Sequence, residues 1–519
     1  MYLTQGLHRA VREAPDRPAT IFGDRIRTVA EHADRIARLA GGLRSLGIAD
    51  GERVAVLSLN SDRYAELLLA VPWANGVLNP VNTRWSPQEI IYSLTDCDTS
   101  MLVVDDTFAP LVPGLVDGHP GLKTVVYAGD GPPPDGTPDG VVDYEELLAG
   151  SAPIPDARRG GDAIAGVFYT GGTTGFPKGV MLTHASILTS TLGAQATHPW
   201  CIPGGRVLHA APMFHLADLA AWATQTLVGG THVIVPAFDP VGVMAAIARH
   251  RVTTAALVPT KIQMLVDHPD RSRYDLSSVR AILYGASPIS GALLERAVEA
   301  FPEAALTQAY GMTELSPITT LLTPDDHRRD DRLGAAGRAA VHAEVRIVDE
   351  AGEEVPRGTV GEIVARGGHV MAGYWGKPDE TATALRDGWM HTGDGGYMDD
   401  DGYVHVVDRL KDMIVTGGEN VYSVEVENAL ARHPAVAACA VIGVPDATLG
   451  ERVHAVVVLQ PGARVTLDEL REHTKALVAG YKAPRSVEFV DTLPLSGAGK
   501  VLKRELRAPH WEGAERQVS

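Results

Sequence analysis

The segment YTGGTTGFPKGVMLTH, residues 169–184, begins like a strand and continues into a loop of glycines and hydroxyl residues that precedes a lysine. Glycines let backbone N–H groups converge on phosphate oxygens, and hydroxyls add hydrogen-bond donors. The residues concerned are Gly171, Gly172, Thr173, Thr174, Gly175 and Lys178. In a GxxxxGK[ST] loop the lysine follows Gly and is followed by Ser or Thr. Here Lys178 stands between Pro177 and Gly179, so the loop is not of that type. The segment predicts a triphosphate cradle outside the P-loop class.

Apolar runs of strand length lie on both sides of this segment. Examples are VAVLSL (54–59), MLVVD (101–105), THVIVP (231–236) and AILYG (281–285), which alternate with helical patterns such as EHADRIARLAGGLRSLG (31–47). Near-continuous apolar strands are typical of sheets that are buried on both faces. The pattern predicts a doubly wound α/β architecture.

The pattern changes twice in the last third of the chain. From about residue 341, short strands with Gly-rich corners indicate a small β unit. After the charged break DRLKD (408–412), helices and strands between residues 423 and 490 predict a compact α+β unit long enough to fold alone. We therefore expect an N-terminal domain at 1–408, a hinge at 409–412 and a C-terminal domain at 413–519.

Composition narrows the class of protein. The 519 residues carry 46 basic and 64 acidic side chains, so the formal charge is −18, which disfavours nucleic acid as a partner. The three cysteines are scattered, which favours a reducing compartment. No apolar run reaches the ~18 to 20 residues that a bilayer crossing needs. We expect a cytoplasmic protein; a peripheral membrane contact and a homodimer are left open.

Further motifs follow the glycine-rich loop in a fixed order. They are PMFH (212–215), YGAS (284–287), QAYGMTE (308–314), GYW (373–375), DGWMHTGD (387–394), DRLKDMIVTGGENVYSVEVE (408–427) and PLSGAGK (494–500). Loop and motifs together resemble the adenylate-forming superfamily, which comprises acyl-CoA synthetases, nonribosomal-peptide adenylation domains and luciferases. The resemblance implies a large N-terminal domain with two doubly wound α/β subdomains and a small β-barrel-like subdomain, followed by a small mobile α+β lid.

The resemblance also implies an ATP-dependent acid–CoA ligase. A carboxylate would attack the α-phosphate of ATP to give acyl-adenylate and pyrophosphate, and a thiol would then expel AMP. Donors and cations should dominate both steps because negative charge develops on oxygens. Glu314 is implied as the Mg²⁺ ligand, Thr313 as an α-phosphate donor, and Lys500 as the cation for adenylation. The other implied nucleotide-binding residues, besides the loop, are Thr170, Gly285, Ala286, Ser287, Tyr310, Gly311, Met312, Asp394 and Arg409.

The C-terminal domain would serve both steps in two orientations. Lys411 corresponds to the family's hinge, and the implied coenzyme A face carries Gly417, Gly418, Glu419 and Lys482. The family's usual Thr or Ser two residues before Gly-Lys is missing here, since Ser496 stands four residues before Lys500. This difference leaves the geometry of the lysine loop in doubt.

The identity of the acid is the least determined part of the prediction. The resemblance places His215 at the mouth of the acyl pocket, with a core or helix-capping histidine as the alternative. The implied wall residues are Trp222, Tyr284, Ala309 and Pro317. Their apolar character favours an aliphatic or aryl monocarboxylic acid. The GGTTG loop resembles that of bacterial fatty acyl-CoA ligases, and this resemblance favours a medium or long fatty acid. An aryl acid, an amine or carrier-protein acceptor, and a nucleotide-binding regulator remain as alternatives.

Overall fold

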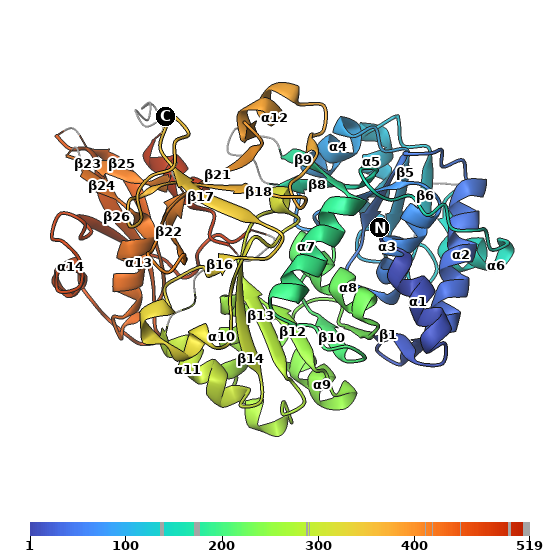
Figure 1. Cartoon of the computed structure of the whole chain (residues 1–519), viewed down its shortest axis with the longest axis horizontal. Helices are drawn as coiled ribbons and strands as arrows, with labels where there is room; N and C mark the ends of the chain where they lie inside the picture. The colour runs from blue at the N-terminus through green and yellow to red at the C-terminus, as the bar shows by residue number, and fades with distance from the viewer. Residues whose placement is uncertain are drawn as a thin grey trace. The chain divides into compact units, whose positions relative to one another are not determined.

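The structure is a computed structural model that describes residues 1–134, 140–170, 177–286, 289, 291–409, 412–417, 419–446, 448–496 and 500–511. The chain divides into two compact units, Met1–Val345 with Ala365–Met390, and Arg346–Val364 with His391–Ser519. The first unit contains two large sheets with their helices, and the second contains the C-terminal sheet (Figure 1). The predicted hinge at 409–412 falls inside the second unit, and its residues Leu410 and Lys411 lie outside the described part.

An eight-stranded sheet forms the N-terminal part of the first unit. Its order is β19-β9-β8-β4-β3-β5-β6-β7, with strands β3 (Arg53–Leu57), β4 (Val77–Pro80), β5 (Met101–Val104), β6 (Thr124–Tyr127), β7 (Val142–Asp143), β8 (Ile164–Thr170), β9 (Lys178–Thr183) and β19 (Gly373–Tyr374). The strands from β8 to β7 are parallel, whereas β9 pairs antiparallel with β8 and β19. The glycine-rich loop thus connects two antiparallel strands at one side of a parallel sheet.

Helices cover both faces of this sheet. They are α1 (Gln5–Glu13), α2 (Val29–Ser45), α3 (Asp62–Trp73), α4 (Pro87–Asp96), α5 (Val112–Gly118) and α6 (Tyr144–Gly150). Val54 and Val56 of β3 belong to a core shared with α2 and α3, whereas Ala55 and Leu57 belong to a core shared with α4 and α5. Because alternate residues of a strand point to opposite faces, a strand buried on both sides must be apolar throughout.

A nine-stranded sheet forms the rest of the first unit. Its order is β16-β15-β14-β13-β12-β10-β11-β1-β2, with strands β1 (Pro18–Phe22), β2 (Arg25–Thr28), β10 (Arg206–His209), β11 (Thr231–Ile234), β12 (Thr254–Leu257), β13 (Ala281–Gly285), β14 (Ala305–Tyr310), β15 (Thr320–Leu322) and β16 (Arg338–Ala339). The six central strands are parallel. One face packs on α9 (Pro240–His250), α10 (Pro259–Val266) and α11 (Gly291–Ala300), the other on α7 (His184–Thr197) and α8 (Leu216–Val228). Two doubly wound sheets confirm the predicted α/β class.

A third sheet has the order β17-β18-β21-β20, with β22 paired to β21. Its strands are β17 (Glu344–Val348), β18 (Gly361–Arg366), β20 (Leu385–Arg386), β21 (Trp389–Met398) and β22 (Val404–Arg409), and helix α12 spans Pro378–Ala384. These are the short strands that the sequence predicts after residue 341. They provide the β subdomain of the predicted architecture.

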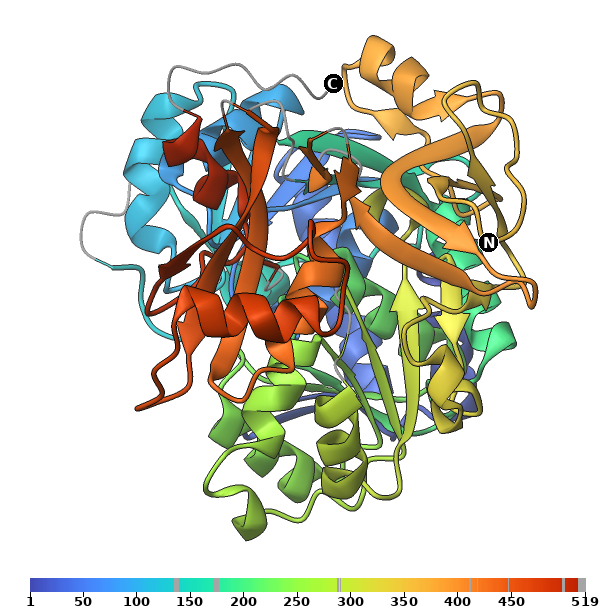
Figure 2. The same cartoon turned by 90° about the vertical axis from the view of Figure 1, so that its left-hand side faces the viewer.

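The C-terminal sheet, orange to red in Figure 2, has the order β24-β23-β26-β25, with β27 paired to β26. Its elements are β23 (Ile414–Thr416), β24 (Glu419–Val421), α13 (Ser423–Ala431), β25 (Val436–Asp446), β26 (Gly450–Leu459), α14 (Leu467–Lys475), β27 (Ser486–Phe489) and α15 (Lys503–Arg507). Val453, Ala455 and Val457 of β26 share one core with α13 and α14. His454 alternates with them and therefore belongs to the opposite face. No helix in the described ranges combines the length and apolarity needed for a membrane crossing.

Candidate active site

The predicted magnesium ligand Glu314 is buried and held by a tyrosine. It lies in the short 3-10 turn η3 (Thr313–Leu315), directly after β14, and is 6% exposed. The Tyr374 hydroxyl donates to Glu314 Oε1 over 2.9 Å, and Met371 N–H donates to the Glu314 carbonyl over 2.8 Å. Since Tyr374 belongs to the edge strand β19, the edge of the eight-stranded sheet fixes the carboxylate that follows a strand of the other sheet.

Lys178 contacts the same tyrosine. Its ammonium lies 5.1 Å from the Tyr374 ring centroid, within range of a cation–π interaction. Tyr374 therefore holds the carboxylate with its hydroxyl and the ammonium with its ring face. The sequence identified the GYW motif but assigned no role to Tyr374; the order of the motif along the chain was the signal that pointed to it.

The ends of the predicted phosphate loop are fixed by strand pairing. Thr170 closes β8, Lys178 opens β9, and the two residues are direct partners in the antiparallel ladder. Gly171, Gly172, Thr173, Thr174 and Gly175 lie outside the described residues, so their contact with phosphate stays a prediction. The described geometry fixes only the two points between which the loop runs.

The predicted adenine-binding segments follow the carboxyl ends of two neighbouring parallel strands, β13 and β14. Gly285 pairs with Ala309, and a Cβ on Gly285 would lie 2.2 Å from the Ala309 carbonyl oxygen. A Cβ on Gly311 would lie 1.9 Å from the Pro317 carbonyl oxygen. Both positions therefore need glycine for close backbone approach. Ligands in α/β sheets commonly bind at such carboxyl ends.

The neighbouring predicted residues complete this edge. Ala286 has a left-handed φ of 68°, and the Tyr310 carbonyl accepts from Thr319 N–H over 2.9 Å. Met312 packs partly buried against the first unit's main core. Ser287 lies outside the described residues. Contact of these residues with adenine stays a prediction.

His215 caps a helix. It is the N-cap of α8, and its Nδ1 accepts from Ala217 N–H over 3.2 Å. In the neutral ring this places the proton on Nε2, where it is a donor. The capping alternative considered from the sequence is thus realised, and it remains compatible with a donor role for the second nitrogen.

The four predicted acyl-wall residues differ in burial. Trp222 of α8 is 1% exposed and Tyr284 of β13 is 2% exposed. The Tyr284 hydroxyl lies 2.7 Å from His327 Nε2, while His327 Nδ1 donates to the Thr323 carbonyl over 2.7 Å. Burial lowers the pKa of His327, consistent with a neutral ring that accepts from the tyrosine. Ala309 and Pro317 flank Gly311, and contact of all four with an acid stays a prediction.

The predicted ribose-binding pair is a cross-strand ion pair in the second unit. Asp394 of β21 and Arg409 of β22 are register partners, and Arg409 Nε lies 2.6 Å from Asp394 Oδ1. Asp394 is 5% exposed, and its N–H donates to Thr392 Oγ1 over 3.1 Å. The arginine thus holds a buried carboxylate in place. Ribose binding by this carboxylate is a prediction.

Lys500 is exposed and is tied to Ser496 by two hydrogen bonds. Ser496 N–H donates to the Lys500 carbonyl over 2.7 Å, and Lys500 N–H donates to Ser496 Oγ over 3.1 Å. Leu495 and Val501 form an antiparallel bridge beside them. The unusual position of Ser496, four residues before the lysine, therefore has a structural reason.

A second lysine three residues later was missed by the sequence reasoning. Lys503 Nζ lies 2.8 Å from Glu427 Oε1 and donates to Ser423 Oγ, and its side chain is 14% exposed. Ser423 N–H and Oγ–H both donate to Asp408 Oδ2 over 2.6 Å. Burial raises the pKa of Glu427 and of Asp408, and the lysine charge opposes this rise. No linear signal distinguishes Lys503 from a solvated tail lysine.

The predicted coenzyme A face is only partly described. Gly417 has a left-handed φ of 61° and donates to the Leu449 carbonyl over 2.8 Å, and Glu419 is exposed on β24. Lys482 Nζ pairs with Glu425 Oε2 over 2.7 Å. Gly418 and the hinge residue Lys411 lie outside the described residues. A role in binding coenzyme A stays a prediction for all of them.

Comparison with known proteins identifies a matching family and similar proteins. The family described as AMP-binding enzyme matches residues 7–375, and its C-terminal domain matches residues 425–500. A feruloyl-CoA synthase of Amycolatopsis is 42% identical over 96% of this chain and 97% of its own length. A medium/long-chain-fatty-acid–CoA ligase of Mycobacterium tuberculosis is 38% identical over 98% of this chain and 90% of its own. The amide bond synthetase McbA of Marinactinospora thermotolerans superposes with a TM-score of 0.87 at 34% identity, over 97% of this chain and 99% of its own.

Proposed function

The chain belongs to the AMP-binding enzyme family, and we propose that it is an ATP-dependent carboxylic acid–CoA ligase acting through an acyl-adenylate. In the first step the acid's carboxylate oxygen bonds to the α-phosphorus of ATP and pyrophosphate leaves. In the second step the thiol sulfur of coenzyme A bonds to the acyl carbon and AMP leaves. The family resemblance drawn from the motifs is confirmed, and so is the assignment as an AMP-forming enzyme.

The contact of Tyr374 with both Glu314 and Lys178 carries the proposal. Glu314 is a buried carboxylate that the Tyr374 hydroxyl orients, and carboxylates are the hard oxygen ligands that suit Mg²⁺. That ion, when bound, would neutralise charge on the phosphates. Lys178 adds a cation at the end of the predicted phosphate loop. Because both charges are held before ATP arrives, they cost little reorganisation when charge develops in the transition state.

Lys500 supplies the mobile cation in this proposal. It is exposed, and a lysine's four-carbon stem with its compact ammonium suits approach to a carboxylate or an α-phosphate. Asp394, oriented by Arg409, would accept hydrogen bonds from the ribose. Gly417, Glu419 and Lys482 would meet coenzyme A after the C-terminal domain, 413–519, turns at the hinge.

For the acid we propose an aryl acid of the hydroxycinnamate kind. The support is the 42% identity to a feruloyl-CoA synthase over nearly the whole of both chains. This reverses the preference for medium or long alkyl acids that the GGTTG loop suggested. Alkyl acids remain the second candidate because of the 38% identity to a fatty-acid–CoA ligase.

The test is pyrophosphate release with Mg·ATP over a panel of hydroxycinnamic, benzoic and alkyl acids, each with and without coenzyme A. We expect turnover on hydroxycinnamic acids that coenzyme A stimulates, and an acyl-CoA product. Turnover confined to alkyl acids would overturn the choice of acid and leave the ligase reaction standing. Absence of pyrophosphate release with every acid would overturn the ligase itself.

An amine acceptor is the second candidate for the second step, because the amide bond synthetase McbA shares the fold at 34% identity. The same panel with an added primary amine and no coenzyme A distinguishes the two. Amide formed faster than acyl-CoA would favour the amine. We expect acyl-CoA to form faster.

A further inference from the structure

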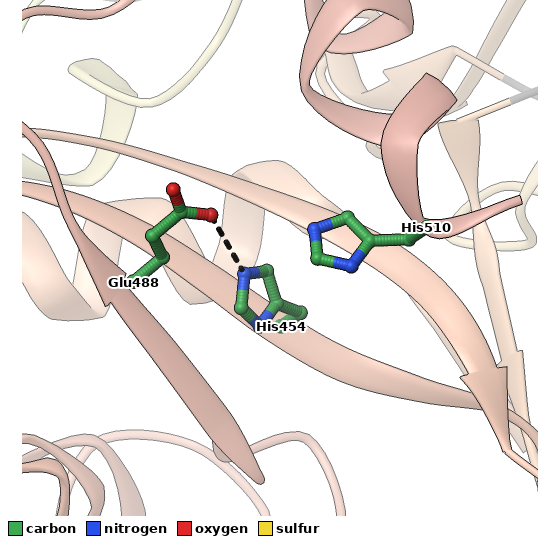
Figure 3. Close-up of side chains that lie close together, drawn as sticks. All are labelled: His454, Glu488 and His510. Atoms are coloured by element: carbon green, nitrogen blue, oxygen red, sulfur yellow. Dashed lines mark ion pairs between the residues drawn. The ribbon is translucent and has the colours of Figure 1, made fainter.

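Three side chains that no part of the proposed reaction uses meet on the C-terminal sheet. They are His454 of β26, Glu488 of β27 and His510 of the 3-10 turn η7 (Ala508–His510), and their ligand atoms all lie within 4.8 Å of one another. Figure 3 shows the three side chains converging. Within the described residues they are the one group of three His, Cys, Asp or Glu side chains that meets this spacing.

Strand register explains why two of them are neighbours. β26 and β27 are parallel, His454 pairs with Ser486, and Val456 pairs with Glu488. Glu488 lies two residues beyond Ser486, so both belong to the same face of the sheet. This face is opposite to the one that Val453 and Ala455 present to α13 and α14.

His454 is oriented as a metal-binding histidine commonly is. Its side chain is 7% exposed, and Nδ1 lies 2.8 Å from Ser486 Oγ. Nε2 is buried, has no hydrogen-bond partner among the described residues, and lies 3.9 Å from Glu488 Oε2. A proton on Nδ1, donated to the serine, leaves the lone pair of Nε2 directed into the group. Hydrogen bonding of the second ring nitrogen in this way fixes the tautomer of metal-ligating histidines.

We propose that His454, Glu488 and His510 bind one divalent transition-metal ion, with Zn²⁺ as the best match. Two imidazoles and one carboxylate are ligands that Zn²⁺ takes in sites with a fourth position for water. Ligand bonds of about 2.0 to 2.2 Å require the three groups to draw closer than they are. Glu488 is exposed and His510 is less buried than His454, so both can rotate toward the ion.

The charges around the group set its strength. Arg452 stands two residues before His454 on β26 and so belongs to the same face of the sheet, where it places a positive charge near the group. Arg452 opposes a cation, whereas Glu488 attracts it. Neutralising this arginine should therefore strengthen binding.

A bound ion would tie the segment that carries Lys500 to the sheet. His510 follows α15, whose Arg507 pairs with Asp412 over 2.7 Å, and Trp511 Nε1 donates to the Gly443 carbonyl over 3.0 Å. The ion would add a further tie between residues 500–511 and the rest of the C-terminal unit, besides those of Lys503, Arg507 and Trp511. An ion that binds the folded chain and not the unfolded chain raises the stability of the protein by mass action.

The test uses the full chain, without a histidine tag and treated with a chelator. Co²⁺ is titrated while visible absorption is recorded, Zn²⁺ is then added in competition, and thermal unfolding is measured with each ion. We expect one equivalent of Co²⁺, bands of four- or five-coordinate Co²⁺ that Zn²⁺ abolishes, and a higher Tm. His510→Ala and Glu488→Gln should each weaken binding at least ten-fold and remove the Tm increase.

A matched control comes from a second histidine pair on the same sheet domain. His433 and His473 have ring centroids 5.0 Å apart, but His473 Nε2 already lies 3.1 Å from the Ala429 carbonyl. His473→Ala should leave binding unchanged. No stoichiometric Co²⁺ binding, or binding that His510→Ala and Glu488→Gln leave intact, overturns the proposal. Because these two variants change accessible side chains, loss of folding does not confuse the result as it would for buried His454.

Discussion

Glu314 and Lys500, the two charged groups most central to the proposed reaction, are held in opposite ways. Glu314 is 6% exposed and fixed by the Tyr374 hydroxyl, whereas Lys500 is exposed and exchanges backbone hydrogen bonds with Ser496 beside the Leu495–Val501 bridge. The first unit thus prepares its charge in advance. The C-terminal segment carries its charge at the end of the long Lys500 side chain. A different residue fixes this segment to the rest of its unit.

That residue is Lys503, three residues after Lys500. It pairs with Glu427 and Ser423 of α13, and Ser423 in turn holds Asp408 beside the predicted hinge. Lys503 therefore fixes the segment that carries Lys500. If Lys500 acts in the reaction and Lys503 fixes the segment, substitutions of the two should affect different properties, namely rate and stability.

The largest expected effect is on stability. Lys503→Met keeps the length of the side chain but leaves Glu427, whose side chain is 20% exposed, without its cation; breaking a fully buried pair costs about 3–5 kcal/mol, and we expect a loss of about 2–3 kcal/mol for this partly exposed one. Denaturant unfolding should show this loss. The exposed pair of Lys475 with Glu472 serves as the control, since Lys475→Met should cost at most about 0.5 kcal/mol.

The double variant Lys503→Met with Glu427→Gln sharpens the same test. Removing the second charge should restore part of the lost stability, because the penalty comes from the uncompensated carboxylate. If Lys503→Met is no more destabilising than Lys475→Met, the anchoring role is wrong.

The contrast between these lysines also shows what the sequence can predict. Lys500 was predicted because it stands in a motif with a fixed order relative to Glu314 and Asp394. Lys503 has no such signal, since its partners Glu427 and Ser423 are 76 and 80 residues away in the chain. A motif reports chemistry that recurs, whereas an ion pair between distant segments appears only after the fold has formed.

Predicted and observed bounds agree closely for elements whose hydrophobic pattern is set by burial. Strands such as β5, predicted at 101–105, occur at Met101–Val104 because a strand covered on both faces must be apolar throughout. The helix predicted at 31–47 runs from Val29 to Ser45, since Thr28 and Glu31 form a capping box that starts it two residues earlier. The tie between Glu314 and Tyr374 was not predictable, because it joins a turn of one sheet to the edge of the other.

The second prediction concerns Lys500 itself. Lys500→Ala should lower the rate of acyl-adenylate formation about 10²–10³-fold, the usual cost of removing one preorganised electrostatic group. Formation of acyl-CoA from supplied acyl-adenylate should be retained, since a different face of the C-terminal domain serves that step in our proposal. Pyrophosphate release and thioester formation are measured separately. Lys500→Arg should restore little activity, because a planar guanidinium replaces a compact ammonium. If Lys500→Ala slows both steps equally, Lys500 does not act in adenylation alone.

The third prediction concerns Glu314, the carboxylate that Tyr374 fixes. Tyr374→Phe removes the hydroxyl that fixes Glu314 but keeps the ring beneath Lys178. A hydrogen bond to a charged group contributes about 1.5–3 kcal/mol, so kcat/KM for Mg·ATP should fall roughly 10- to 100-fold and more Mg²⁺ should be needed for half-maximal rate. Tyr397→Phe, on a ring stacked against His405, is the control and should change neither. An unchanged Mg²⁺ requirement in Tyr374→Phe would remove the tyrosine from the site.

The smallest expected effect separates two roles of His215. His215→Ala removes the N-cap of α8 and should cost about 0.5–2 kcal/mol of stability, whereas His215→Asn keeps a capping oxygen and should restore most of it. Asparagine lacks the ring donor at Nε2, so we expect KM for the acid to stay raised in both variants. The measurements are thermal unfolding and steady-state kinetics with the preferred acid. If asparagine restores KM together with stability, His215 only starts the helix, and the acid's carboxylate must be held by other groups of the first unit.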